Sequence, residues 1–161
     1  MNKELFCGID PSITNTGVTL IDGGFNVIEQ QLICTSVQKR PFDTELRLIH
    51  IVKQLEFLLN YKRDLKIVNI EGISFGSKGE GVAQLAALNY LIRIFLLQND
   101  ILYSEIPPTK LKKFITGKGQ CKKNLILKEV YKKWNVDIDD DNIADSYVLA
   151  RMAESNWKKT E

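Results

Sequence analysis

The sequence predicts an α/β fold with a mixed five-stranded sheet flanked by helices. Short apolar runs of strand length open the chain, and amphipathic helical patterns separate the later ones. The chain has 161 residues, enough for one domain with a full hydrophobic core, and we expect residues 1–161 to form it. Its 44% hydrophobic and 26% charged residues are the ordinary balance of a globular protein.

The first three strands are predicted to form an antiparallel meander over residues 5–10, 16–22 and 25–34. The second and third are joined at a turn containing Gly23 and Gly24. A helix follows from about Asp43, and its apolar stripe includes Leu48, Ile51 and Leu55. This helix leads to a buried strand over 65–71, which such a crossover places parallel to the sheet.

The second half of the chain alternates helices with one more strand. Residues 82–97 form a helix that is apolar almost all round, so we expect it to be buried on more than one side. A strand over 101–106 precedes a helix that starts at Pro107 and Pro108. Further helices are predicted over 122–134 and 142–154.

Nothing in the sequence predicts a membrane partner. The apolar stretch 82–97 contains Gln84, Asn89 and Arg93 and is shorter than the ~20 residues of a membrane span. Three cysteines without a CxxC pair argue against a disulfide framework or a zinc site. We therefore expect a soluble protein of a reducing cytoplasm, or of the host cytoplasm if the protein is viral.

Four acidic residues stand at the ends of predicted elements. Asp10 closes the first strand, Glu71 closes the strand over 65–71, and Asp141 and Asp145 open the last helix. Positions 141 and 145 are four apart and share a helix face. Taken singly, each acid has another explanation: a turn residue before Pro11, an exposed strand end, or a helix cap at Asp141. Together they predict one convergent carboxylate cluster.

A carboxylate cluster of this kind favours a magnesium-dependent phosphodiesterase. Hard oxygen ligands suit Mg²⁺, and Mn²⁺ is expected to substitute for it. Two ions about 4 Å apart would activate a water and stabilise the leaving oxygen. The single histidine, His50, lies inside a predicted helix and is expected to be structural.

A basic segment lies beside the acids in the sequence. Nine lysines and one acid, Glu129, lie between Pro107 and Trp134, although the net charge of the chain is only +2. A basic surface next to an acidic cluster can hold a polyanion near bound metal. Two solvated helices followed by an acidic turn would give the same pattern.

Three short blocks resemble the signature blocks of RuvC-type Holliday junction resolvases. They are residues 8–12 with Thr16 and Gly17, then Ile70 and Glu71, then residues 144–146. The glycine-rich loop after Glu71 and the apolar helix after that loop are also similar. The resemblance spans nearly the whole chain.

The resemblance implies an RNase H-like fold and a homodimer that nicks two strands of a four-way DNA junction, with Asp10, Glu71, Asp141 and Asp145 as metal ligands. It implies that helix 82–97 forms much of the dimer contact. Phe75 is similar in place to an aromatic wedge at the junction centre, although a core phenylalanine is the alternative. The remaining expected DNA contacts are Lys78, Lys110, Lys118, Lys122 and Lys123, with Lys110 and Lys118 nearest the scissile phosphate.

Several alternatives stay open on the sequence. Many relatives space the last two ligand positions three apart, which would select Asn142 in place of Asp141. The same acids would serve another RNase H-like nuclease that cuts RNA–DNA hybrids, flaps or RNA. A catalytically inactive DNA-binding module is a third possibility. The Gly8-to-Asp10 block also resembles a phosphate loop of actin-like ATPases, but 161 residues are too few for their two domains.

Overall fold

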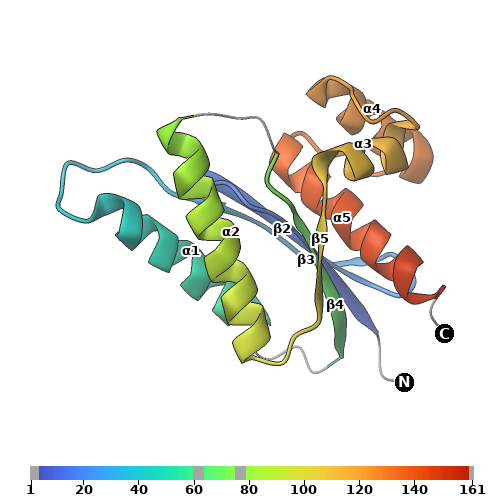
Figure 1. The fold of residues 1–161 in the computed structure, drawn as a ribbon. Coiled ribbons are helices and arrows are strands. Elements are labelled where there is room, and N and C mark those ends of the chain that lie inside the picture. The colour runs from blue at the N-terminus through green and yellow to red at the C-terminus, as the bar shows by residue number, and fades with distance from the viewer. Residues whose placement is uncertain (1–3, 60–63, 75–78, 160–161) are drawn as a thin grey trace.

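The computed structural model describes residues 4–59, 64–74 and 79–159 of the chain. Its centre is a five-stranded sheet with the strand order β3-β2-β1-β4-β5 (Figure 1). The strands are β1 (Leu5–Asp10), β2 (Asn15–Asp22), β3 (Val27–Cys34), β4 (Leu65–Glu71) and β5 (Tyr103–Ile106). Both the antiparallel meander and the later strands lie where the sequence predicts them, to within two residues at each end.

The sheet is mixed, as predicted. β1 pairs antiparallel with β2, with Asp10 opposite Gly17, and β2 pairs antiparallel with β3. β4 and β5 continue the sheet on the other side of β1 in parallel orientation. The carboxyl ends of β1 and β4 therefore meet at one edge, which is where a parallel sheet gathers functional side chains.

The helices form a layer on each face of the sheet (Figure 1). They are α1 (Asp43–Leu59), α2 (Glu80–Gln98), α3 (Pro108–Thr116), α4 (Lys123–Trp134) and α5 (Asp141–Trp157). One apolar cluster packs α1 and α2 against the sheet, through residues such as Ile51 and Leu88. A second cluster packs α5, with α3 and α4 beside it, against the opposite face.

α5 lies unusually close to the sheet because two glycines face it. A Cβ atom added at Gly8 would lie 2.0 Å from the carbonyl oxygen of Ser146, and one added at Gly17 would lie 2.2 Å from that of Asn142. Both distances are far inside van der Waals contact. Polar contacts follow from this approach: the hydroxyls of Thr19 and Ser146 lie 2.7 Å apart. The glycines thus fix the position of the N-terminal half of α5.

The apolar helix α2 is only partly covered in the single chain. Leu88, Ile92 and Leu96 are fully buried against the sheet, as predicted. The other side is open: the exposed fractions are 57% for Tyr90, 38% for Leu91, 48% for Ile94 and 69% for Leu97. By length and composition, residues 81–98 would also pass for a membrane span, a test that core helices of soluble proteins pass as well.

Replacing Gly17 with alanine is expected to lower the free energy of unfolding by about 3 kcal/mol, the upper range for overpacking. The added methyl group meets backbone atoms of α5, which cannot rotate away. Urea unfolding measures the change. The matched control is Gly81→Ala, where nothing lies within 4 Å of the added Cβ and helix propensity favours alanine. Equal stability of the two variants would contradict the close packing of α5.

Candidate active site

Two of the predicted acids stand at the carboxyl ends of neighbouring strands. Ile9 on β1 is in register with Ile70 on β4, so Asp10 and Glu71 follow at adjacent positions of the parallel pair. Asp10 is buried, with 6% of its surface exposed, and Glu71 is half-buried. The sheet therefore brings these two carboxylates to one edge, as the sequence predicted.

The other two acids lie on the first turns of α5. The cap of this helix is Asp140, whose carboxylate accepts hydrogen bonds from the backbone N–H groups of Asn142 (2.9 Å) and Ile143 (3.0 Å). The alternative interpretation of Asp141 as the cap is therefore wrong: Asp141 is the first helical residue. Asp141 and Asp145 are both half-buried and lie one turn apart.

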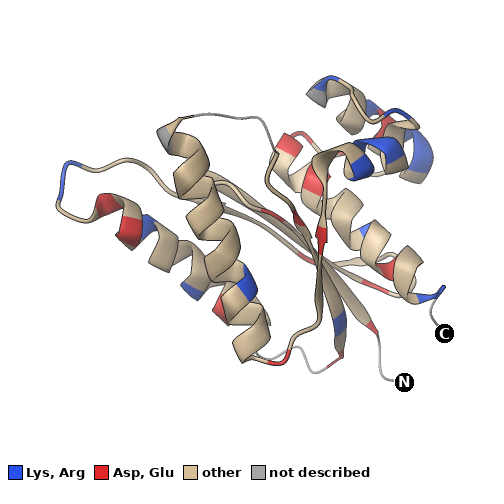
Figure 2. Ribbon diagram, viewed as in Figure 1, with Lys and Arg blue, Asp and Glu red and all other residues tan. Residues whose placement is uncertain are grey.

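The contact at Gly17 brings the start of α5 to the edge that holds Asp10. Asp10 is the register partner of Gly17, and Gly17 abuts the backbone of Asn142. The N-terminal turn of α5 is thus next to the carboxyl end of β1. Figure 2 shows acidic residues at this end of α5 and on the adjoining strands.

The donor set at this edge suits a divalent hard cation. It consists of carboxylate oxygens, the ligands that Mg²⁺ and Mn²⁺ prefer. In the described part of the chain, no three acidic, thiol or imidazole side chains form a ready-made metal cluster. Mg²⁺ commonly completes its coordination with water and substrate phosphate oxygens.

The softer metal ligands of the chain lie elsewhere. His50 is exposed on α1, in the helical layer on the opposite face from α5. Cys7 is buried in the core, and burial raises the pKa of its thiol far above the usual range. Neither side chain therefore lies among the four acids of the candidate site.

Two polar residues of α2 reach the same edge, and the sequence interpretation did not assign them to the site. The side-chain amide of Asn89 donates a hydrogen bond to the backbone carbonyl oxygen of Glu71 (3.0 Å). Arg93 forms an ion pair with Glu105 on β5 at 3.2 Å. The sequence feature that could have pointed to these two residues is their spacing of four positions within an otherwise apolar helix.

The lysine-rich helices stand beside the acidic edge. Glu71 is in register with Ile106 at the end of β5, and α3 begins two residues later at Pro108. Figure 2 shows lysines gathered on α3 and α4, close to the N-terminal end of α5. A hollow next to this edge is lined by residues of the β4 end, β5 and the start of α3. The positive charge of the lysines on α3 and α4 suits a phosphate backbone.

The predicted DNA contacts are distributed as follows. Lys110 lies on α3, Lys118 follows it, and Lys122 precedes α4, and all three side chains are exposed. Lys123 is the first residue of α4. Phe75 and Lys78 lie outside the described residues, as does the side chain of Lys123.

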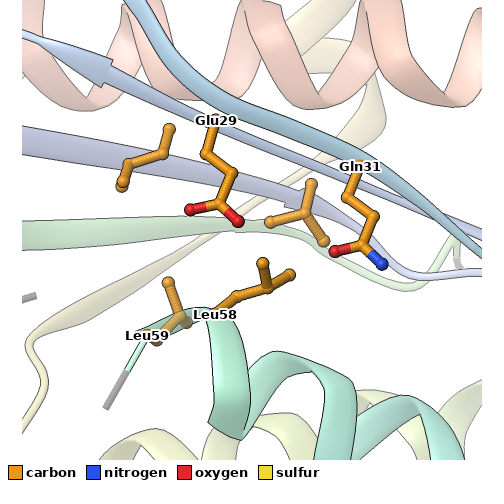
Figure 3. Close-up of a pocket in the computed structure, with 6 residues that line it drawn as sticks. Glu29, Gln31, Leu58 and Leu59 are labelled. Atoms are coloured by element: carbon orange, nitrogen blue, oxygen red, sulfur yellow. The ribbon is translucent and has the colours of Figure 1, made fainter. Parts of the chain in front are cut away.

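A second hollow lies away from the acidic edge. It is formed between β3 and the C-terminal end of α1, where Glu29 and Gln31 face Leu58 and Leu59 (Figure 3). Its enclosed space has room for about one water molecule. The acidic edge is therefore the stronger candidate for a functional site.

A known protein family matches most of the chain. The model of the family described as crossover junction endodeoxyribonuclease RuvC matches residues 6–151. Among curated proteins, the RuvC enzyme of Caldicellulosiruptor saccharolyticus is 28% identical over 150 residues, covering 89% of this chain and 87% of its own. That of Brachyspira hyodysenteriae is 27% identical over 146 residues and covers 89% of each chain.

A solved structure shows the same fold. The structure of Thermus thermophilus RuvC in complex with a Holliday junction substrate aligns with a TM-score of 0.76 at 14% identity, over 98% of this chain and 96% of that one. The resemblance of the sequence blocks and the RNase H-like fold that they implied are confirmed. Since the family model spans residues 6–151 of 161, the chain belongs to the RuvC family of crossover junction endodeoxyribonucleases.

Proposed function

We propose that this protein resolves four-way DNA junctions by metal-dependent paired nicking in DNA recombination or repair, with residues 1–161 as one nuclease domain. The placement of four acids from β1, β4 and α5 at one sheet edge supports this proposal most directly. The family and the lysines beside that edge support DNA as the substrate. The compartment that we propose is the cytoplasm.

Asp10, Glu71, Asp141 and Asp145 would hold the metal, two Mg²⁺ ions per site, with Mn²⁺ able to replace them. When bound, the ions supply an activated water and stabilise the leaving oxygen. The strands keep Asp10 and Glu71 fixed, and the cap at Asp140 fixes the start of α5. The exposed lysines would neutralise and orient the phosphate backbone, which leaves the carboxylates to act at one phosphate.

We propose Asp141 as the fourth ligand rather than Asn142. The carboxylate of Asp140 is already used by two backbone N–H groups. The backbone of Asn142 faces Gly17, while Asp141 lies one turn before Asp145. An ionised carboxylate is also a stronger ligand for Mg²⁺ than an amide oxygen.

Asp145→Asn is expected to lower cleavage by orders of magnitude, because it removes a charged ligand while keeping the side-chain shape. Binding of the junction without metal should persist or strengthen, since one repelling charge is lost. Asp141→Asn should behave alike, and Asn142→Ala should be much milder. Cleavage of a synthetic four-way junction with and without Mg²⁺ measures all three.

The same assay on flaps, plain duplex and RNA–DNA hybrid separates the competing functions. Preference for the hybrid would favour the other RNase H-like nuclease, and metal-independent binding without any cleavage would favour an inactive binding module. Full Mg²⁺-dependent cleavage by Asp145→Asn would overturn the site assignment. An inactive Asn142→Ala beside a normal Asp141→Asn would overturn the choice of the fourth ligand.

We further propose that the protein is a homodimer, joined through the exposed side of α2. Paired nicks need two active sites, and the open side of α2 carries Tyr90, Leu91, Ile94 and Leu97 in one apolar band. A second copy would bury this band through a two-fold contact, the commonest arrangement of soluble oligomers. Burial in a dimer also accounts for its apolar character without a membrane.

Leu91→Glu is expected to give folded monomers at micromolar concentration, because it places a charge in the apolar band while Leu91 is already 38% exposed in the single chain. Sedimentation velocity measures the change. Leu88→Glu would be a poorer test, since Leu88 is fully buried and the variant should unfold. The matched control is Val37→Glu, at a 75% exposed loop position. A wild-type monomer would contradict the dimer.

Junction binding is expected to weaken steeply with salt, because lysines displace counterions from the phosphates. Lys118→Ala and Lys122→Ala should each lower affinity for all DNA sequences alike and reduce the slope of log affinity against log salt by about 1. Fluorescence anisotropy in metal-free buffer measures this slope. The control is Lys53→Ala, an exposed lysine on α1. A binding affinity that does not change with salt concentration would show that α3 and α4 are not the DNA-binding face.

A further inference from the structure

Asn89 joins α2 to the candidate metal site. Its side chain is fully buried on the side of α2 that faces the sheet, beside Leu88 and Ile92. Its Nδ2 atom donates to the backbone carbonyl oxygen of Glu71 at 3.0 Å. The bond therefore ends on the backbone of Glu71, the residue at the strand position adjacent to Asp10.

The Glu71 carbonyl lies where the backbone ladder of the sheet runs out. On one side, the strand end is held by β5, since the N–H of Gly72 donates to the carbonyl oxygen of Ile106 at 2.8 Å. On the other side, β1 passes from Asp10 into Pro11, which has no N–H to donate. The amide of Asn89 gives this carbonyl a donor from the helical layer.

An asparagine at this position has a cost that its packing does not explain. Its Oδ1 atom is buried and has no hydrogen-bond partner among the described residues. A buried acceptor without a partner destabilises the fold, and a leucine would suit the apolar neighbours better. The interaction that offsets this cost is the hydrogen bond from Asn89 to the carbonyl oxygen of Glu71.

The next turn of α2 makes a second contact with the end of the sheet, through Arg93. Arg93, four residues after Asn89, pairs with Glu105 and lies over the rings of Tyr90 and Tyr103. Hydrogen bonding to Tyr103 and the charge of Glu105 raise the pKa of Arg93. Glu105 itself packs against Gly72, the residue after Glu71. The ends of β4 and β5 are thus both tied to α2.

We propose that Asn89 is a positioning residue that orients Glu71 for binding a divalent metal ion. A held carbonyl restrains the backbone torsions of Glu71, and these torsions limit which side-chain rotamers can bring its carboxylate to the metal site. Removing a residue that hydrogen-bonds to a metal-binding residue typically lowers metal affinity by about 10- to 100-fold. This inference rests on the proposed role of Glu71 as a metal ligand.

The test measures metal binding on the full chain without DNA. Asn89→Ala and Asn89→Leu are titrated with Mn²⁺, and affinity is read by calorimetry and by the metal-dependent rise in Tm. Both variants should bind Mn²⁺ about 10- to 100-fold more weakly than the wild type. The matched control is Asn99→Ala, which removes a similar amide-to-carbonyl bond, to Phe95 at 2.8 Å, at the far end of α2.

A second measurement separates positioning from a purely structural role. In a Glu71→Gln background, the effect of Asn89→Ala on Mn²⁺ affinity should vanish, while its effect on urea unfolding should remain. Wild-type affinity in both Asn89 variants, an equal loss in Asn99→Ala, or an undiminished effect in the Glu71→Gln background would overturn the proposal. So would failure of both variants to fold, since Asn89 would then be needed for the fold itself.

These outcomes are distinct from failure of the proposed function. If the wild type binds Mn²⁺ through Glu71 but cuts no junction, the resolvase activity fails and the role of Asn89 stands. If junctions are cut and Asn89→Ala binds Mn²⁺ normally, only the role of Asn89 fails.

Discussion

The close contact between α5 and the β1–β2 pair is the constraint on which the rest of the structure depends. Gly8 and Gly17 let the backbone of the helix approach the sheet so closely that a single methyl group at either position would collide with it. The approach sets the height and direction of α5. Because Asp141 and Asp145 lie on its first turns, the same contact decides whether they reach the edge that holds Asp10 and Glu71.

Different structural features position the acids around this contact. The register of the parallel strands aligns Asp10 with Glu71, and the cap at Asp140 starts α5 at the right residue. Asn69 adds a bond from β4 to the carbonyl oxygen of Leu149 in α5 at 3.1 Å. Acids placed by separate elements repel one another until a cation arrives, so a rigid frame is needed to hold them.

α2 combines two tasks that a core helix rarely has together. One side packs on the sheet and reaches Glu71 and Glu105 through Asn89 and Arg93. The other side is an apolar band open to solvent in the single chain. In the homodimer that we propose, this helix would form the contact between the two copies while also touching the end of β4.

The sequence by itself determined the order of the strands and helices, the mixed sheet and the family. Apolar periodicity predicts the helices and strands, since each buries one face in a regular pattern, whereas the family followed from the resemblance of three short blocks. It also marked Asp10, Glu71 and Asp145 as carboxylates that end or begin elements beside apolar runs. Only the tertiary structure decided that Asp140 and not Asp141 caps α5, because capping depends on backbone direction. It alone revealed that Asn89 reaches Glu71, 18 positions earlier in the sequence. A contact between a helix and a strand end depends on which residues pack together in space, so no repeating pattern in the sequence predicts it.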